Sequence, residues 1–437
     1  MKTFADLGLH KLVMKAINEL GYETPTPIQL KAIPQLLDDK DLLGIAQTGT
    51  GKTAAFALPT LDYLLEEPAL RVPKSTRVLV LAPTRELASQ IAESFSNYSR
   101  YMDCVVQTVF GGVKINKQIR DLSKGTHVLV ATPGRLLDLA SQGAVTLADI
   151  EVLILDEADQ MLDMGFIHDL KKIIAQIPKD RQTLLFSATM PKSISELANQ
   201  FLDHPVRVSV APESTTAERV NQGVIHIAAG DKPKLLGAVL KDSKINRALV
   251  FTRTKHGADK VVRKLKGEGI EAAAIHGNKS QPQRMKALAA FKDGHCKVLV
   301  ATDIAARGID ISGITHVVNY EMPNVPEQYV HRIGRTARAG KDGLAISLIA
   351  ADELYYLRDI EKTIRQSIPV LDVPEGADIS ALPTPDPSIR PVKPKGPSGG
   401  RGGGNRRRGG GHGGGQKRRS GGGGNRNRNR SRSKAPA

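Results

Sequence analysis

Short apolar runs that stop at a polar residue or a proline recur along this chain and constrain its fold. Four of them occupy the first half, at residues 78–83, 128–133, 152–156 and 184–187. Each is apolar along its length rather than at alternate positions, which is typical of strands buried on both faces. Such strands predict a parallel sheet flanked by helices, and ligands bind such a sheet at the carboxyl ends of its strands. The polar residues that end the runs are therefore the candidate functional residues.

The same pattern returns in the second half of the chain, at residues 248–252, 298–303 and 316–320. Between the halves lies a polar segment, residues 211–216, which is typical of a linker. We therefore expect two similar α/β domains, of which only the first contains a Gly-Lys-Thr loop. The second domain can still act on a ligand of the first from across a cleft.

The segment Ala46–Thr53 reads Ala-Gln-Thr-Gly-Thr-Gly-Lys-Thr and lies between an apolar run and a small-residue helical stretch. This order predicts a strand–loop–helix phosphate site, in which glycines let backbone N–H groups approach phosphate oxygens. Lys52 would bring a cation to the outer phosphates, and Thr53 would offer a hydroxyl to nucleotide-bound Mg²⁺. Ala46 departs from the strict pattern, which has glycine there. The alternative is a glycine-rich turn that binds nothing.

Two further clusters supply charges that phosphoryl transfer requires. Asp156 ends an apolar run, where it could contact Mg²⁺, and Glu157 could orient and deprotonate an attacking water. Arg332, Arg335 and Arg338 stand three residues apart, on one face if the segment is helical, and the planar fork of arginine suits phosphate oxygens. The alternatives are a helix N-terminus with favourable charge and a solvated basic face.

The net charge of +17 belongs to the C-terminal tail. Residues 387–437 carry 15 of the 62 Lys and Arg residues and no Asp or Glu, which leaves 47 basic and 45 acidic residues before them. Residues 396–437 contain 16 glycines and no large apolar side chain, so we expect this tail to be disordered. Its Lys and Arg clusters would tether nucleic acid electrostatically, and a merely solubilising tail is the alternative.

The cysteine content and the distribution of apolar residues bear on the compartment. Cys104 and Cys296 form no disulfide framework, and no run of 18 apolar residues or N-terminal apolar signal core occurs. We therefore expect a soluble protein of the reducing cytoplasm.

In its motifs the chain resembles the DEAD-box ATP-dependent RNA helicases of superfamily 2, over about residues 4–368. The tetrad Asp-Glu-Ala-Asp at 156–159 is the one that names this family. Around it stand, in the family's order, the Q motif at 21–29 with Phe4 upstream, the segments 83–87, 111–112, 132–135 and 187–189, and in the second half 250–254, 281–284, 301–310 and 331–338.

The resemblance implies two tandem RecA-like parallel-sheet domains joined by a flexible linker. The expected boundaries are a Q-motif region at 1–30, a first domain at 31–208, a linker at 209–222, a second domain at 223–368, and a disordered tail at 369–437, first Pro-rich and then Gly/Arg-rich.

The resemblance also implies roles in the binding and hydrolysis of ATP with Mg²⁺. Gln29 would read the adenine edge, and either Tyr22 or Phe4 would stack on the base. Lys52 and Glu157 would act in hydrolysis, with Arg335 and Arg338 as arginine fingers. The ATP-binding set is Phe4, Tyr22, Gln29, Ala46, Gln47, Thr48, Gly49, Thr50, Gly51, Lys52, Thr53 and Asp310, with Thr53 and Asp156 on Mg²⁺. Alanine is what this family usually has at position 46.

RNA would lie across both domains, on residue types that contact phosphates and sugars without reading sequence. The implied contacts are Arg85, Gly112, Thr132, Arg135, Thr254, Gly277, Arg284 and Thr302. Ser187 and Thr189 would link hydrolysis to strand separation. Segments 110–113, 251–257, 274–280 and 357–362 resemble the bacterial RhlE-like branch, which is associated with ribosome maturation and RNA turnover.

The resemblance therefore implies an enzyme that unwinds short RNA duplexes locally or remodels RNA–protein complexes. An ATP-gated RNA clamp that separates few strands is one alternative. A DNA translocase is another, and the complete Q motif and tetrad argue against it.

Overall fold

The computed structural model describes residues 3–47, 49–210, 220–242, 245–306, 311, 313–337, 343–374, 377, 379–386 and 388–389. Thr48, Asp310 and Arg338 of the predicted site lie outside the described residues, as do 211–219 of the predicted linker and most of the predicted tail from 387 onward. No helix in the described ranges is long and apolar enough to cross a membrane.

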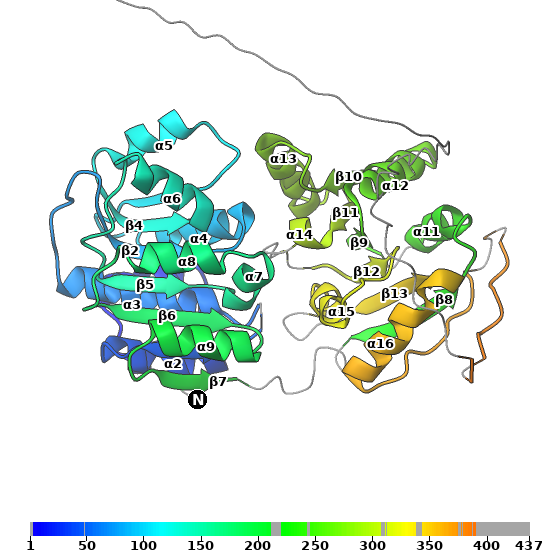
Figure 1. Ribbon diagram of the computed structural model, residues 1–437, viewed down its shortest axis with the longest axis horizontal. Helices are drawn as coiled ribbons and strands as arrows, with labels where there is room; N and C mark the ends of the chain where they lie inside the picture. Colours follow the sequence, from blue (N-terminus) through cyan, green and yellow to red (C-terminus); the bar gives the residue numbers. More distant parts are fainter. Residues whose placement is uncertain are drawn as a thin grey trace, which may run out of the picture. The chain divides into compact units, whose positions relative to one another are not determined.

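The first domain is built on a seven-stranded parallel sheet in the order β3-β4-β2-β5-β6-β1-β7 (Figure 1). Its strands are β1 (Leu42–Ile45), β2 (Thr76–Leu81), β3 (Val106–Val109), β4 (Thr126–Ala131), β5 (Val152–Leu155), β6 (Gln182–Ser187) and β7 (Val206–Ser209). Its helices are η1 (Phe4–Leu7), α1 (Lys11–Glu19), α2 (Pro27–Leu37), α3 (Lys52–Glu66), α4 (Arg85–Tyr98), α5 (Ile115–Leu122), α6 (Pro133–Ser141), α7 (Ala158–Asp163), α8 (Ile167–Ile174) and α9 (Lys192–Phe201).

Helices cover both faces of this sheet, which explains why its strands are apolar throughout. Along β2, Val78 and Val80 pack into a core with residues of α1–α4, whereas Leu79 and Leu81 pack into a second core with residues of α5–α9. The Q-motif region, predicted as a separate segment, contributes Phe4 to the first of these cores. Residues before α2 are thus part of the packed first domain.

The second domain has a six-stranded parallel sheet in the order β10-β11-β9-β12-β13-β8. Its strands are β8 (Asn221–His226), β9 (Ala248–Thr252), β10 (Ala272–Ile275), β11 (Val298–Thr302), β12 (His316–Asn319) and β13 (Leu344–Ile349). Its helices are α11 (Lys232–Leu240), α12 (Lys255–Gly267), α13 (Gln281–Lys292), α14 (Asp303–Ala306), α15 (Pro326–Ile333), η2 (Ala351–Glu353) and α16 (Leu354–Ile364). Residues of α11 and α12 pack on one face, and residues of α13–α16 pack on the other.

The two sheets share one strand order. Reading each sheet from its β3 or β10 edge, β10, β11, β9, β12, β13 and β8 correspond to β3, β4, β2, β5, β6 and β1, and β7 is additional in the first domain. The prediction of two parallel-sheet α/β domains of the RecA-like class is confirmed. The correspondence also defines equivalent positions at the ends of equivalent strands.

The second domain extends further along the chain than predicted, because residues just after 368 pack on β8. Leu371 N–H donates to the Val224 carbonyl (2.8 Å), and Leu382 N–H donates to the His226 carbonyl (2.8 Å). Leu371 also packs against the apolar core on the α11–α12 face. Since β8 is the outermost strand of its sheet, this segment covers an edge that would otherwise expose unpaired backbone groups. The prediction of disorder from 369 onward was therefore wrong for this stretch.

Candidate nucleotide site and RNA-contact residues

The predicted phosphate loop turns through two glycines that hold left-handed backbone conformations. Gly49 has φ +86° and Gly51 has φ +89°, a region that residues with a Cβ rarely adopt. Gly51 is the N-cap of α3, and Lys52 is the first residue of that helix. The loop therefore ends at a helix N-terminus, where free backbone N–H groups and the helix dipole favour a bound phosphate.

Gln29 braces this loop from the first turn of α2. Its Oε1 accepts a hydrogen bond from Thr26 N–H (2.8 Å), and its Nε2 donates to the Gly51 carbonyl (3.1 Å). A Cβ added to Gly51 would lie 2.6 Å from Gln29 Nε2, so the close contact requires glycine. The structure thus brings the Q motif into direct contact with the phosphate loop, and Nε2 keeps a second N–H that can meet a ligand.

The two aromatic candidates for base stacking lie one behind the other. The rings of Phe4 and Tyr22 are stacked, with centroids 6.0 Å apart, and Phe4 is buried. Tyr22 is only partly buried and lines the same hollow as Gln29, Lys52, Asp156 and Glu157. Its hydroxyl is 2.8 Å from that of Tyr98. Of the two alternatives, Tyr22 lines the hollow, whereas Phe4 is buried and stacks on the Tyr22 ring.

Lys52, Asp156 and Glu157 form a buried charged cluster at the carboxyl edge of the sheet. Lys52 Nζ lies 3.8 Å from Asp156 Oδ1 and, among the described residues, has no hydrogen-bond acceptor. Burial raises the pKa of Asp156, and the nearby Lys52 opposes this rise. A buried cation without a hydrogen bond is costly by itself, which favours a site built for an anionic ligand.

Glu157 stands in a conformation that is unusual for its residue type. It has φ +54° as the N-cap of α7, and its N–H donates to Asp156 Oδ1 (2.9 Å). Residues with a Cβ pay a steric cost for such a backbone, and strain of this kind concentrates at functional sites. The turn buries Glu157 beside Asp156 in the hollow.

The donor set fits Mg²⁺ that arrives with a nucleotide. Mg²⁺ usually keeps several waters and takes one or two protein oxygens plus phosphate oxygens. Asp156 offers a carboxylate and Thr53 a hydroxyl, and both line the hollow. Within the described ranges no group of three or more His, Cys, Asp or Glu residues could hold a metal alone. The carboxylate of Asp156 and the hydroxyl of Thr53 therefore suit an ion that also binds phosphate oxygens.

Asp159 is a functional candidate that sequence reasoning missed. Its Oδ2 accepts hydrogen bonds from Ala188 N–H (3.1 Å), Thr189 N–H (3.0 Å) and the Thr189 hydroxyl (2.9 Å). Ser187 Oγ donates to the Thr189 carbonyl (2.7 Å). Asp159, the last residue of the tetrad, therefore links the tetrad to the segment 187–189, for which a coupling role is predicted. The available signal was a second aspartate three residues after Asp156.

In the first domain, the predicted RNA contacts gather after three neighbouring strands. Arg85 begins the helix after β2, Gly112 follows β3, and Thr132 follows β4. Gly112 has φ +79°, and a Cβ there would lie 1.9 Å from Arg85 Nη1, so the guanidinium rests on this turn. Arg135, in the first turn of α6, donates from Nη1 to the Val113 carbonyl (3.4 Å). These residues thus form one group at the carboxyl edge.

The second domain repeats this arrangement at the corresponding strands. Thr254 caps α12 after β9, its hydroxyl accepting from Gly257 N–H (3.0 Å). Gly277 follows β10, and Thr302 is the last residue of β11. Arg284 lies in the first turn of α13. Three predicted contacts in each domain therefore follow equivalent strands, β2 and β9, β3 and β10, and β4 and β11, whereas Arg135 and Arg284 lie in helices that follow the non-equivalent strands β4 and β10.

Arg335 follows Gly334, the C-cap of α15, and is buried, lining a small hollow with Asp303, His331 and Arg332. The second predicted arginine finger, Arg338, and the predicted ribose contact, Asp310, lie outside the described residues.

The fold and this site define a class of two-domain ATP-hydrolysing enzymes with RecA-like sheets. A family model described as DEAD/DEAH box helicase matches residues 26–197, and one described as helicase conserved C-terminal domain matches residues 231–340. The chain belongs to the family of DEAD-box ATP-dependent RNA helicases, and it is accordingly an RNA-binding, RNA-stimulated ATPase.

Several curated relatives and solved structures are similar to this chain. The ATP-dependent RNA helicase CshA of Listeria monocytogenes is 44% identical over 374 residues, which cover 86% of this chain and 71% of that protein. The RNA helicase CrhR of Synechocystis is 44% identical over 380 residues, 87% of this chain and 76% of that protein. Dbp5 of S. cerevisiae bound to RNA and ADP BeF3 superposes with a TM-score of 0.76 at 31% identity, covering 85% of this chain and 96% of that one.

Proposed function

We propose that this helicase uses ATP to separate short RNA duplexes locally or to remodel RNA–protein complexes, without strong sequence preference. The observation that carries this proposal is the matched set of residues at the ends of β2, β3 and β4 and of β9, β10 and β11. Hydroxyls, glycines and arginines contact phosphates and sugars, which carry no sequence information. Recognition of shape and the 2′-hydroxyl allows RNA to be preferred without a strongly basic core.

In the proposed nucleotide site each residue has a separate task. Tyr22 would stack on the base and Gln29 would hydrogen-bond its edge, while Asp310 would contact the ribose. Residues 46–53 would hold the phosphates, with Lys52 as a buried cation beside them. Mg²⁺ on Thr53 and Asp156 would neutralise phosphate charge.

The attack on the γ-phosphate would depend on groups from both domains. Glu157 would orient a water and take its proton, which moves to the Glu157 carboxylate as the new O–P bond forms. The bond between the γ-phosphorus and the β,γ-bridging oxygen breaks in the same step, and ADP leaves with the electron pair on that oxygen. Arg335 and Arg338 would stabilise the charge that develops on the phosphoryl oxygens. We also propose that Asp159 passes changes at the tetrad to Ser187 and Thr189, because its carboxylate binds that segment directly.

The four segments that resemble the RhlE-like branch support a cytoplasmic role in ribosome maturation or RNA turnover. Protein partners from either process would fit this role.

A short RNA duplex with one fluorescent strand tests the proposal. A helicase releases the strand at a rate that depends on hydrolysable ATP. Long ATP-dependent residence on RNA without strand release would instead identify an ATP-gated clamp, and equal release from a DNA duplex would identify a DNA translocase. Thr189→Val should lower strand release more than ATP hydrolysis if the Asp159 contact couples the two.

A further inference from the structure

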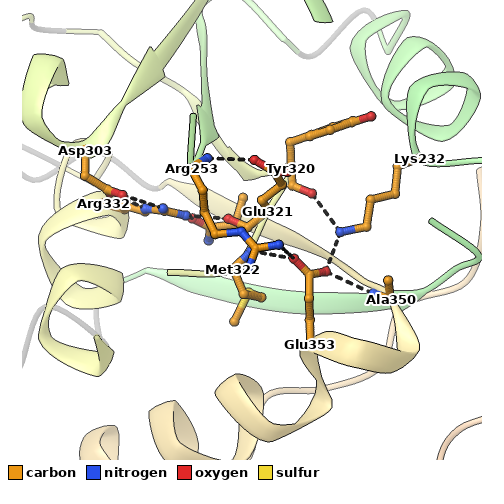
Figure 2. A network of polar contacts seen from close by, with 10 residues as sticks. Lys232, Arg253, Asp303, Tyr320, Glu321, Met322, Arg332, Ala350 and Glu353 are labelled. Atoms are coloured by element: carbon orange, nitrogen blue, oxygen red, sulfur yellow. Dashed lines mark hydrogen bonds and ion pairs between the residues drawn. The ribbon is translucent and has the colours of Figure 1, made fainter. Parts of the chain in front are cut away.

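A buried arginine in the second domain joins three parts of the chain (Figure 2). Arg332 forms a two-pronged ion pair with Asp303, through Nε–Oδ1 (2.5 Å) and Nη2–Oδ2 (2.7 Å). Its Nη1 donates to Asn319 Oδ1 (3.1 Å) and to the Glu321 carbonyl (2.7 Å). Its guanidinium carbon lies 4.9 Å from the ring centroid of Phe251. These contacts fix both the position and the orientation of the Arg332 guanidinium, because its N–H donors form a rigid planar fork.

Arg335 is attached to Arg332 through the backbone. Arg335 N–H donates to the Arg332 carbonyl (3.1 Å), and Gly334 N–H donates to the Val330 carbonyl (3.0 Å). The two side chains line the same small hollow with Asp303. A shift of Arg332 therefore moves the turn that carries Arg335.

A buried acid, Glu353, forms a second centre of contacts (Figure 2). It pairs with the buried Lys232 and accepts hydrogen bonds from Met322 N–H (3.0 Å) and Ala350 N–H (3.1 Å). Arg253 Nη2 lies 3.8 Å from its Oε1. Neither Lys232 nor Glu353 lies in a segment on which the resemblance to the DEAD-box family rests.

The two centres meet at the segment 320–322, which follows β12. Backbone hydrogen bonds from Tyr320 N–H (3.1 Å) and Glu321 N–H (3.3 Å) to the Phe251 carbonyl tie it to β9. Four further contacts involve side chains: the Tyr320 carbonyl accepts from Lys232 Nζ (2.8 Å), the Glu321 carbonyl accepts from Arg332 Nη1 (2.7 Å), the Glu321 carboxylate accepts from Arg253 N–H (2.7 Å), and Met322 N–H donates to Glu353 (3.0 Å). Both of its outer residues are held by the Lys232–Glu353 pair, and its middle residue is held by Arg332.

We propose that the Lys232–Glu353 pair is a positioning element for Arg335. The pair fixes segment 320–322, this segment fixes Arg332, and Arg332 fixes the turn that carries Arg335. The inference rests on the proposed role of Arg335 as an arginine finger. Lys232 and Glu353 act through other residues and contact no substrate, so they are positioning residues.

The chemistry of the pair makes it sensitive to an isosteric change. Glu353→Gln keeps the shape of the side chain but replaces one acceptor oxygen with a donor group, and it leaves Lys232 buried without its counter-charge. Segment 320–322 must then relax around the unpaired ammonium. Misplacing a catalytic group by a fraction of an ångström lowers turnover more than it lowers binding of the ground-state substrate.

The test measures steady-state ATP hydrolysis by the full chain at saturating RNA, for Glu353→Gln, Arg335→Lys and the double variant. Glu353→Gln is expected to lower kcat about tenfold with the KM for ATP changed by less than about twofold. In the Arg335→Lys background, Glu353→Gln should lower kcat by less than about twofold, because its route of action is already broken. Glu361→Gln is the matched control. This acid lies in the same domain and also accepts one backbone N–H, from Ile368 (2.9 Å), but it has no contact with segment 320–322 among the described residues.

The outcomes separate the inference from the proposed function. If Arg335→Lys leaves kcat unchanged, the finger role itself fails. If Arg335→Lys lowers kcat and Glu353→Gln lowers it by the same factor in both backgrounds, the positioning role is overturned and the finger role stands. A Glu353→Gln protein with wild-type kcat also overturns it. If Glu353→Gln does not fold, Lys232→Met/Glu353→Gln removes both charges together and must show the same dependence on Arg335.

Discussion

Two buried lysines hold corresponding places in the two domains and have different surroundings. Lys52 is the first residue of α3 after β1, and Lys232 is the first residue of α11 after the corresponding strand β8. Within the described ranges Lys52 Nζ has one charged neighbour, Asp156 at 3.8 Å, and no hydrogen-bond acceptor. Lys232 Nζ donates to Glu353 and to the Tyr320 carbonyl.

The segments that face these lysines correspond as well. Asp156 and Glu157 follow β5, and Tyr320 and Glu321 follow the corresponding strand β12. In the first domain the lysine and the acids remain in a hollow that a ligand can enter. In the second domain the corresponding lysine, Lys232, pairs with Glu353, which lies in a later part of the chain. Lys232 and Glu353 together hold Tyr320 and Met322, which flank Glu321. On our proposals, one fold supplies a nucleotide site in the first domain and a positioning element in the second, and the two buried lysines differ in their partners accordingly.

The largest effect on ATP hydrolysis is expected at Glu157, because we assign its catalytic role to no residue of the second domain. Glu157→Gln should lower kcat for RNA-stimulated ATP hydrolysis by about 10²–10⁴-fold, because the amide keeps the shape but cannot accept the proton of the attacking water. ATP-dependent RNA binding should persist. Steady-state hydrolysis and RNA-binding titrations with ATP measure the two properties.

Glu151→Gln is the matched control. Glu151 lies just before β5, at the amino end of the strand that Asp156 and Glu157 follow, and it pairs with Arg77 (2.5 Å). It should leave kcat near the wild-type value. Wild-type hydrolysis by Glu157→Gln would remove the catalytic assignment.

The lysines themselves give the next largest effect, on the free energy of unfolding. Lys232→Met should destabilise the protein by about 3–5 kcal/mol, because it removes the cation in closest contact with the buried Glu353 and leaves Arg253 at 3.8 Å as its ion-pair partner. Lys52→Met should cost clearly less, since Lys52 has one long contact, and should instead abolish ATP hydrolysis. Denaturant unfolding and ATPase assays on the same samples check both effects. Equal destabilisation by the two changes would contradict the comparison.

Two glycines test the difference between the loop that joins β1 to α3 and the corresponding loop that joins β8 to α11. Gly51 has φ +89° and a Cβ there would lie 2.6 Å from Gln29 Nε2, whereas nothing lies within 4 Å of a Cβ at Gly230. Gly51→Ala should weaken ATP binding by roughly tenfold, through a strain of about 1–3 kcal/mol in the phosphate loop. Gly230→Ala should leave ATP affinity within about twofold, because a Cβ at Gly230 would enter open space and would not strain the backbone. Titration with a fluorescent ATP analogue measures both, and equal losses would refute the difference between the loops.

The central strands were predictable from the sequence, and the edge strands were not. Runs such as Val152–Leu155 are buried on both faces and are apolar throughout. The strands that were not predicted are β3, β7, β8 and β10, which form the sheet edges, and β13, which lies beside β8. Burial is partial in β3, β7 and β10, which weakens the apolar signal, whereas β8 and β13 are largely buried, and β13 was missed although it is apolar over much of its length. The same reasoning missed the packed segment after residue 368, because its apolar residues are scattered among prolines.

In the site, the sequence predicted the residues that form local motifs and missed those that meet through the fold. Gly51, Lys52 and Asp156 stand in short recognisable patterns. The Lys232–Glu353 pair has no such pattern, since its members are 121 residues apart and meet only when β8, β12 and β13 assemble. Asp159 was visible as an acid, but its contact with Thr189 depends on the adjacency of β5 and β6.

The smallest effect concerns buried histidines, of which the second domain has two with shifted pKa values. Burial lowers the pKa of His226 and of His316 below the ordinary value of 6.5, while Glu361 and Asp242 respectively oppose the shift. In the described part of the first domain, the partly buried His127 also has a lowered pKa, for which desolvation is the largest cause. A lowered pKa means that the unfolded chain binds protons more readily than the folded chain as the pH falls below 6.5. The contribution of these histidines to the free energy of unfolding is therefore fully present above pH 6.5, and it is lost as the pH drops towards the pKa of the folded state.

Thermal unfolding between about pH 7.5 and about pH 5.5 tests this expectation. The Tm of the wild-type protein should fall across this range, and His316→Gln should reduce the fall, because glutamine does not titrate there. His295→Gln is the control, since His295 is exposed, and it should leave the fall unchanged. If His316→Gln and His295→Gln behave alike, the burial of His316 does not contribute to the acid sensitivity of the second domain.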